Sequence, residues 1–341
     1  MEGLADLRAI CSAPGKVILF GEHAVVYGHP AIAAATDQRT QVEVDCCGDR
    51  FTVNGYRLHD RFHSYLLSAV EQVWRRPDPV RIQTEGGVPS ASGTGSSAAL
   101  TVATVAALRQ LQGKTDLPGL AQDAFAVERM TQGGGSPTDT STATAGGGIA
   151  IAASTDPPNV GQKLWDVAWT EPGKERAWTV ERIDLPEMTV VVGNSGIKGK
   201  TAEQVAKVAN AARKNAMVRD RLAEIGALTR EAVPNLGRRD MVAVGTLMNK
   251  AHSALHTLGV NHPAVEALVQ AARATPGTLG AKITGAGGGG SMFALTERPE
   301  AVAAAIQAHG GTAYIVRLGG PGVRFDSPAE PVAEIPGETT A

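Results

Sequence analysis

The stretch that most constrains this chain is residues 88–99, VPSASGTGSSAA, which joins an expected strand to an apolar, helix-forming segment. Gly93 and Gly95 allow the backbone to turn tightly and to approach a ligand closely, because they carry no Cβ. Ser96 and Ser97 place two hydroxyls at the start of the helix, where unpaired N–H groups and a partial positive charge favour anions. The stretch therefore predicts either a phosphate-binding loop or an ordinary serine-capped helix, and these residues alone do not separate the two.

Strands and helices alternate along the rest of the chain without a regular strand–helix–strand rhythm. Apolar runs and alternating patterns predict strands at 17–20, within 21–30, and at 40–45, 80–84, 147–153, 188–193 and 312–318. Amphipathic patterns predict helices at 62–76, 117–132, 201–232, 239–256, 264–273 and 302–310. This mixture favours an α+β fold over a doubly wound sheet.

The length of 341 residues exceeds the usual size of one domain, so two domains are expected. We place the boundary before the strand at 188–193, which gives domains at 1–185 and 186–341. The segment 157–182 holds three of the four tryptophans and is expected to form a hairpin or surface insertion. Asn54-Gly55 indicates a second hairpin, at 51–58.

Composition narrows the function classes. The formal net charge is −2 and aromatic residues make up 4%, which argues against a nucleic-acid or membrane surface. The three cysteines do not suggest a disulfide framework, and no C-x-x-C pair indicates a structural zinc site. No run of 18 apolar residues and no signal-peptide pattern is visible, so a cytoplasmic protein is expected.

Two further features can be interpreted in more than one way. Residues 133–148, GGGSPTDTSTATAGGG, could form a flexible linker, although a single acid, Asp139, stands in the middle. His252 and His256 are four residues apart on an expected helix, a spacing that can bind a metal. HSALH has no glutamate beside the first histidine and no evident third ligand, so a metal site is not predicted there.

Four segments together resemble the GHMP small-molecule kinases, and among these the archaeal mevalonate kinases, over roughly residues 10–320. They are SAPGKVILFGEHAVVYG at 12–28, the loop at 88–99, VERMTQGGGSPTDT at 127–140 and KITGAGGGGS at 282–291. GEHAVVYG and SPTDT are the more specific signals. The family pattern P-x-x-x-G-x-G-S-S-A is met by Pro89, Gly93, Gly95, Ser96, Ser97 and Ala98. Ala91, Thr94 and Ser291 depart from common family residues without removing a reacting group.

The resemblance implies a fold and a set of roles. The fold has a ribosomal protein S5 domain 2-like N-terminal domain and a ferredoxin-like C-terminal domain. ATP would be bound by Pro89, Ser92, Gly93, Thr94, Gly95, Ser96, Ser97 and Ala98. Mg²⁺ would be held by Ser97 and Glu128. Asp139 would be the catalytic base and Lys16 its cationic neighbour. The substrate would be bound by Glu22, His23, Thr201, Gly285 and Ala286.

The activity implied is ATP-dependent phosphorylation of mevalonate to 5-phosphomevalonate, and the resemblance is compatible with a homodimer. Phosphomevalonate kinase and mevalonate 3-kinase are alternatives within the family. A non-catalytic sensor that keeps the ATP loop is an alternative of another class. Lys16 together with Asp139 argues against a sensor, since binding alone needs neither a base nor its cationic partner.

Overall fold

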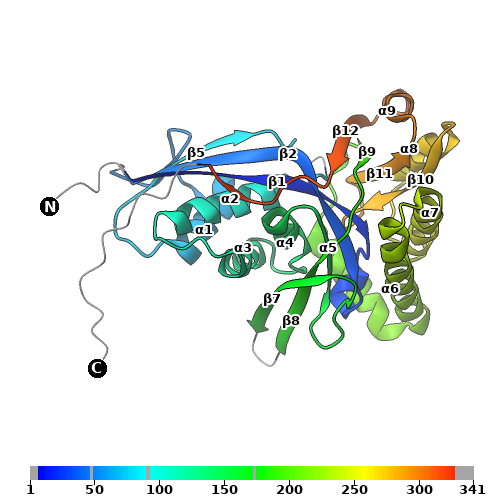
Figure 1. Ribbon diagram of the computed structural model, residues 1–341, viewed down its shortest axis with the longest axis horizontal. Coiled ribbons are helices and arrows are strands. Elements are labelled where there is room, and N and C mark those ends of the chain that lie inside the picture. Colours follow the sequence, from blue (N-terminus) through cyan, green and yellow to red (C-terminus); the bar gives the residue numbers. More distant parts are fainter. Residues whose placement is uncertain (1–6, 47–48, 90–92, 172–173, 327–341) are drawn as a thin grey trace.

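The computed structural model describes residues 7–46, 49–89, 93–171 and 174–326. Two long antiparallel strands, β1 (Arg8–Phe20) and β2 (Ala31–Asp45), run through the middle of the molecule (Figure 1). The short 3-10 helix η2 (Ala24–Tyr27) connects them, where the sequence had predicted a strand; that expectation was wrong. Gly21 and Gly28 flank the connection with left-handed backbone angles, which prevents an extended course there.

The N-terminal half adds strands at both ends of β2. They are β5 (Arg81–Gly86), the small hairpin β3 (Thr52–Val53) and β4 (Tyr56–Arg57), and β6 (Gly148–Ala153) followed by the hairpin β7 (Gln162–Glu171) and β8 (Lys174–Ile183). The expected turn at Asn54-Gly55 is confirmed, since both residues have positive φ angles, of 49° and 82°. Four helices accompany this sheet: α1 (Asp60–Val73), α2 (Ser96–Gln110), α3 (Leu117–Gln132) and α4 (Thr138–Ala145).

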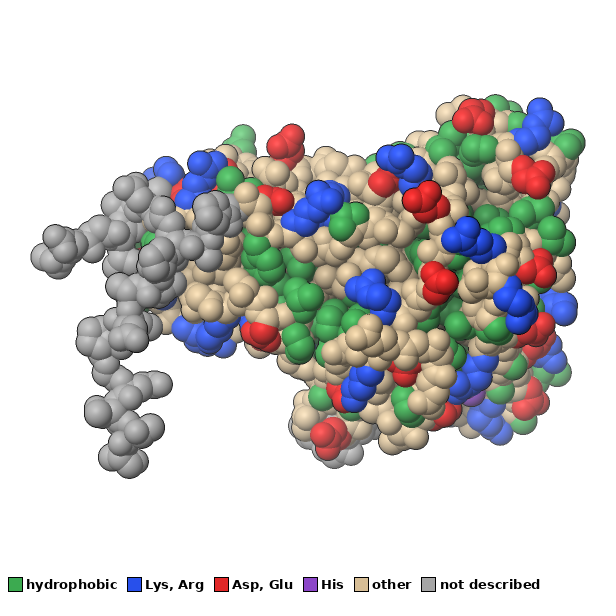
Figure 2. Space-filling view, in the orientation of Figure 1, with side chains coloured by type: hydrophobic (Ala, Val, Ile, Leu, Met, Phe, Trp, Pro, Cys, Tyr) green, Lys and Arg blue, Asp and Glu red, His purple; other side chains and the backbone are tan. Residues whose placement is uncertain are grey.

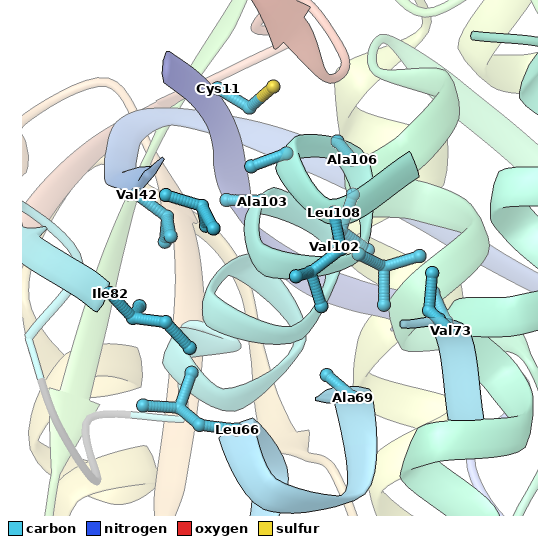
Figure 3. Packing of buried hydrophobic residues seen from close by; sticks show 14 of the residues in the cluster. Cys11, Val42, Leu66, Ala69, Val73, Ile82, Val102, Ala103, Ala106 and Leu108 are labelled. Atoms are coloured by element: carbon cyan, nitrogen blue, oxygen red, sulfur yellow. The ribbon is translucent and has the colours of Figure 1, made fainter. Parts of the chain in front are cut away.

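Helix α2 is the centre of the N-terminal core. It is apolar on nearly every side, which is typical of a helix that is buried all round. Figure 3 shows its Val102, Ala103, Ala106 and Leu108 between strand residues and α1. The strand residues are Cys11, Val42 and Ile82, and those of α1 are Leu66, Ala69 and Val73. This packing fixes the start of α2, and with it the glycine loop, relative to β1.

The C-terminal half is a four-stranded sheet with helices. Strand β9 (Met188–Asn194) lies between β11 (Ser291–Thr296) and β12 (Thr312–Leu318), and β10 (Thr278–Thr284) forms the edge. The helices are α5 (Thr201–Lys214), α6 (Ala216–Gly237), α7 (Met241–Thr257), α8 (Pro263–Ala274) and α9 (Pro299–Ala308). Leu318 of β12 pairs with Thr36 of β2, so the two halves share one continuous sheet.

The segment after β12 returns to the N-terminal half. Gly146 bridges Pro321, and β13 (Arg324–Phe325) pairs with β1. The Arg39 guanidinium donates to the carbonyls of Pro321 and Gly322 at 2.7 and 2.9 Å. The division into domains at 185 and 186 stays a prediction, and this returning segment crosses it.

The mixed α+β architecture is confirmed, whereas one more local expectation was wrong and the linker alternative does not hold for residues 138–145. Phe62, expected on the apolar side of its helix, is 72% exposed. Residues 138–145, within the suspected linker, form α4, whose Thr138 to Thr144 are largely buried. The Trp-rich hairpin is confirmed as β7 and β8. None of the helices in the described ranges is long and apolar enough to span a bilayer.

The Trp-rich hairpin packs on α3. Trp178 lies edge-on to Phe125 of α3 at 5.5 Å between ring centroids, and the Arg129 guanidinium lies 5.1 Å from the Trp169 ring centroid. Gln122 hydrogen-bonds both the N–H and the carbonyl of Ala168. The hairpin therefore holds α3, which ends at the site described next.

Candidate active site

A cleft of about 640 Å³ lies between the two halves, and all four sequence motifs reach it. From the N-terminal half it is lined by β1, the start of α2, the end of α3 and the start of α4. From the C-terminal half it is lined by the segment before α5 and by the β10–β11 loop. Figure 2 shows basic and acidic side chains interspersed over one face of the molecule, without a large patch of one sign.

The glycine loop is folded directly against Lys16. Gly93 and Gly95 have φ angles of 78° and 79°, and a Cβ on Gly95 would lie 2.7 Å from Cγ of Lys16. The Lys16 N–H donates to the Thr94 carbonyl at 2.7 Å. The backbone thus requires glycine at position 95 for both its angle and its space.

The other expected nucleotide-binding residues divide into two groups. Gly93, Gly95, Ser96 and Ser97 line the cleft. Thr94 and Ala98 are buried behind it. Pro89 leads toward the loop, whereas Ser92 lies outside the described residues.

Gly95→Ala tests this close approach. We expect kcat/KM for ATP to fall at least tenfold, because the methyl group displaces Lys16, and the strain to cost about 1–3 kcal/mol of stability. Gly55→Ala is the matched control, since Gly55 has a similar φ of 82° with nothing within 4 Å of an added Cβ. Steady-state kinetics and urea unfolding measure both effects. Equal kinetic losses in the two variants would contradict the proposed contact.

Lys16 and Asp139 form an ion pair inside the cleft. Lys16 Nζ lies 2.8 Å from Asp139 Oδ2, and the side chains are 7% and 28% exposed. Lys16 follows a register shift in β1, and Asp139 stands in the first turn of α4. The carboxylate thus remains accessible to a ligand while its cationic partner is almost fully buried.

Glu128, in the last turn of α3, presents a second carboxylate. Its Oε1 accepts a hydrogen bond from Gln132 Nε2 at 3.2 Å, and its buried Oε2 has no hydrogen-bond partner. Burial, with the nearby Asp139 carboxylate as the second cause, raises the pKa of Glu128 to about 8. An unpartnered carboxylate oxygen, with the Ser97 hydroxyl lining the same cleft, fits the oxygen ligands that Mg²⁺ prefers.

The raised pKa of Glu128 gives a pH test. Without metal, the folded protein keeps this proton from about pH 4.5 to 8 while the unfolded chain loses it, so stability falls as the pH rises through that window. We expect Glu128→Gln to gain thermal stability relative to the wild type between about pH 5 and pH 9. Melting temperatures recorded in EDTA measure this difference in stability. Glu85→Gln, at an exposed position of β5, is the control. Parallel pH profiles for wild type and Glu128→Gln would refute it.

Glu22 and His23 bind the β10–β11 segment as well as lining the cleft. The Glu22 carboxylate forms an ion pair with Lys282 Nζ, and their side chains are 1% and 0% exposed. His23 Nε2 lies 2.9 Å from the Ala286 carbonyl. Burial lowers the pKa of His23, so a neutral ring donates this bond. Their expected substrate role stays a prediction, and their observed contacts join the two halves.

Sequence reasoning missed Lys282, the partner of Glu22, and Gln132, the partner of Glu128. A lysine inside the buried run AKIT was the available signal for Lys282, because a buried cation needs a partner. Thr201, Gly285 and Ala286 line the cleft, and their expected substrate role stays a prediction. The histidine pair does not form a joint site: His252 is buried and lies 2.9 Å from Glu266 Oε2, while His256 is exposed.

Comparison with known proteins places the chain in a family. Residues 63–147 match the model "GHMP kinases N terminal domain", and residues 232–314 match "GHMP kinases C terminal". The mevalonate kinase of Thermococcus onnurineus is 33% identical over 94% of this chain and 99% of its own. This chain belongs to the GHMP kinases.

Solved structures of similar proteins support the assignment of this chain to the GHMP kinases. The Methanococcus jannaschii mevalonate kinase has a TM-score of 0.71 at 26% identity, covering 92% of this chain and 98% of its own. The L. major mevalonate kinase, solved in complex with R-mevalonate, has a TM-score of 0.73 at 25% identity, covering 93% and 96%. The GHMP kinase fold expected from the sequence is therefore confirmed.

Proposed function

We propose that this GHMP kinase transfers the γ-phosphoryl group of ATP to the primary hydroxyl of mevalonate. The observation that carries the proposal is the Lys16–Asp139 pair, 2.8 Å apart, in the cleft that the glycine loop also lines. Phosphoryl transfer needs positioning, charge neutralisation and a path for the hydroxyl proton. The relatives named mevalonate kinase, similar over almost the whole chain, support mevalonate as the acceptor.

The residues of the cleft have different roles in this reaction. The backbone around Gly93 and Gly95 and the start of α2 bind the phosphates. Asp139 takes the proton of the acceptor hydroxyl. The oxygen of that hydroxyl forms a bond to the γ-phosphorus of ATP, and the bond between this phosphorus and the bridging oxygen breaks, which releases ADP. Lys16 stabilises the Asp139 carboxylate and the negative charge of the transferring group. Mg²⁺, held by Ser97 and Glu128, would neutralise phosphate charge.

An acceptor comparison tests the function. Turnover is measured as ADP release with mevalonate, 5-phosphomevalonate or galactose, and phosphorus NMR identifies the phosphorylated carbon. We expect turnover with mevalonate and a product phosphorylated at the primary hydroxyl. A product phosphorylated at the tertiary hydroxyl, or turnover of 5-phosphomevalonate alone, would identify one of the other family activities. No turnover of any acceptor, with ATP still bound, would favour a sensor.

Two further properties are part of the proposal. Cys11 is a buried free thiol, which supports a reducing compartment such as the cytoplasm. A homodimer is compatible with the family, and sedimentation equilibrium of the purified protein measures it.

A further inference from the structure

Two side chains without a role so far, Gln132 and Tyr65, lie between the two expected metal ligands, Glu128 and Ser97. Gln132 Nε2 donates to the Tyr65 hydroxyl at 2.8 Å and to Glu128 Oε1 at 3.2 Å. Burial raises the pKa of Tyr65, and the Ser97 side chain, which lies close to the Tyr65 hydroxyl, acts against this rise. The order Ser97–Tyr65–Gln132–Glu128 thus crosses three helices, α2, α1 and α3, along one wall of the cleft.

This arrangement leaves Glu128 with one engaged and one unengaged oxygen. Gln132 holds Oε1, and the buried Oε2 has no hydrogen-bond partner. A buried carboxylate oxygen without a partner is costly unless a ligand satisfies it. The planar amide of Gln132, bound to both neighbours, fixes the rotation of the Glu128 carboxylate and so the direction in which Oε2 points.

Helix packing does not account for this arrangement. Helices α1 and α3 already contact each other through apolar residues of the N-terminal core, including Leu66 and Leu120. A second polar bond between them, from Thr131 Oγ1 to Ser68 Oγ at 3.3 Å, involves no residue that lines the cleft. The Tyr65–Gln132 bond differs from it because Gln132 also binds Glu128 and the Tyr65 hydroxyl lies close to Ser97, so each end meets an expected metal ligand.

We propose that Tyr65 and Gln132 are positioning residues, which hold the Ser97 hydroxyl and the Glu128 carboxylate at the separation that the nucleotide-bound divalent cation requires. This rests on the proposed function, since it concerns the metal of the same site. Outer residues that orient metal ligands typically change metal affinity about 10- to 100-fold when they are removed. They do so without contacting the metal, so their loss weakens cation binding more than it alters the acceptor site.

Mn²⁺ binding tests this without any phosphoryl transfer. Protein-bound Mn²⁺ is measured by electron paramagnetic resonance in the presence of saturating ADP, for wild type, Tyr65→Phe and Gln132→Leu. We expect the dissociation constant for Mn²⁺ to rise roughly tenfold in each variant. We also expect KM for mevalonate to change less than about twofold, since neither residue is among those expected to bind the acceptor. Thr131→Val is the matched control, because it removes the other polar bond between the same helices.

The outcomes separate the two proposals. Wild-type Mn²⁺ affinity in Tyr65→Phe and Gln132→Leu, or an equal loss in Thr131→Val, would overturn the positioning role. Melting temperatures show whether a loss reflects a folding defect, and Tyr65→Phe removes only one hydroxyl. Failure of the proposed function would look different: Mn²⁺ and ADP would bind, and the wild type would not phosphorylate mevalonate.

Discussion

Replacing Asp139 with asparagine is expected to lower kcat about 10²- to 10⁴-fold while ATP still binds. Asparagine keeps the size of the side chain but cannot accept the acceptor's proton. The glycine loop and the start of α2, which we propose to bind the phosphates, are unchanged in this variant. Isothermal titration with ATP measures the binding, and steady-state turnover of mevalonate measures kcat.

Asp156→Asn is the matched control for this variant. Asp156 pairs with Arg230 at 2.7 Å on the surface, with its own side chain 68% exposed, so the same chemical change should leave turnover within about twofold. Since Asp139→Asn also removes the partner of the nearly buried Lys16, its melting temperature must be recorded. A folded Asp139→Asn enzyme that keeps a tenth or more of wild-type kcat would show that another group takes the proton.

The second large effect is expected at the buried pair of Glu22 and Lys282. Lys282→Met removes one partner and leaves the other carboxylate buried and uncompensated, which should lower the free energy of unfolding by about 3–5 kcal/mol. Burial raises the pKa of Glu22 and lowers that of Lys282, so each charge depends on the other. Urea unfolding of Lys282→Met, Glu22→Gln and the double variant measures the coupling.

We expect the double variant to recover much of the loss, because no unpaired charge remains buried. Lys163→Met is the control, since Lys163 pairs with Asp166 at 2.6 Å on the surface and should change stability by less than about 1 kcal/mol. If Lys282→Met were no more destabilising than Lys163→Met, the buried pair would not stabilise the join between the two halves.

The sequence predicted the individual elements better than their long-range partners. The glycine loop, the buried helix behind it and the Asn54-Gly55 turn follow from local chemistry, because glycine and apolar residues restrict their own surroundings. Phe62 was assigned to the core from helical periodicity, yet it is exposed. Its position in the first turn of α1, beyond the packed part of the helix, decides this, and periodicity carries no information on where packing stops.

The site was predicted from the resemblance rather than from spacing. Residues 133–148 have the composition of a linker, and only tertiary burial makes 138–145 a helix that directs Asp139 at Lys16. Glu22 and Lys282 lie 260 positions apart, and no local pattern reports such a pair. The link from Gln132 to Tyr65 likewise depends on how α1 packs against α3, which the sequence of neither helix specifies.

The returning segment 319–326 has a consequence for biosynthesis. Ser12 Oγ donates to Asp326 Oδ2 at 2.6 Å, a contact between residues 314 positions apart. When the N-terminal half leaves the ribosome, β13, which will cover the edge of β1, and the Pro321 and Gly322 carbonyls that Arg39 binds are still untranslated or inside the exit tunnel. The nascent N-terminal half therefore keeps an open sheet edge, a state in which chaperones act and aggregation competes, until the segment 319–326 has been made.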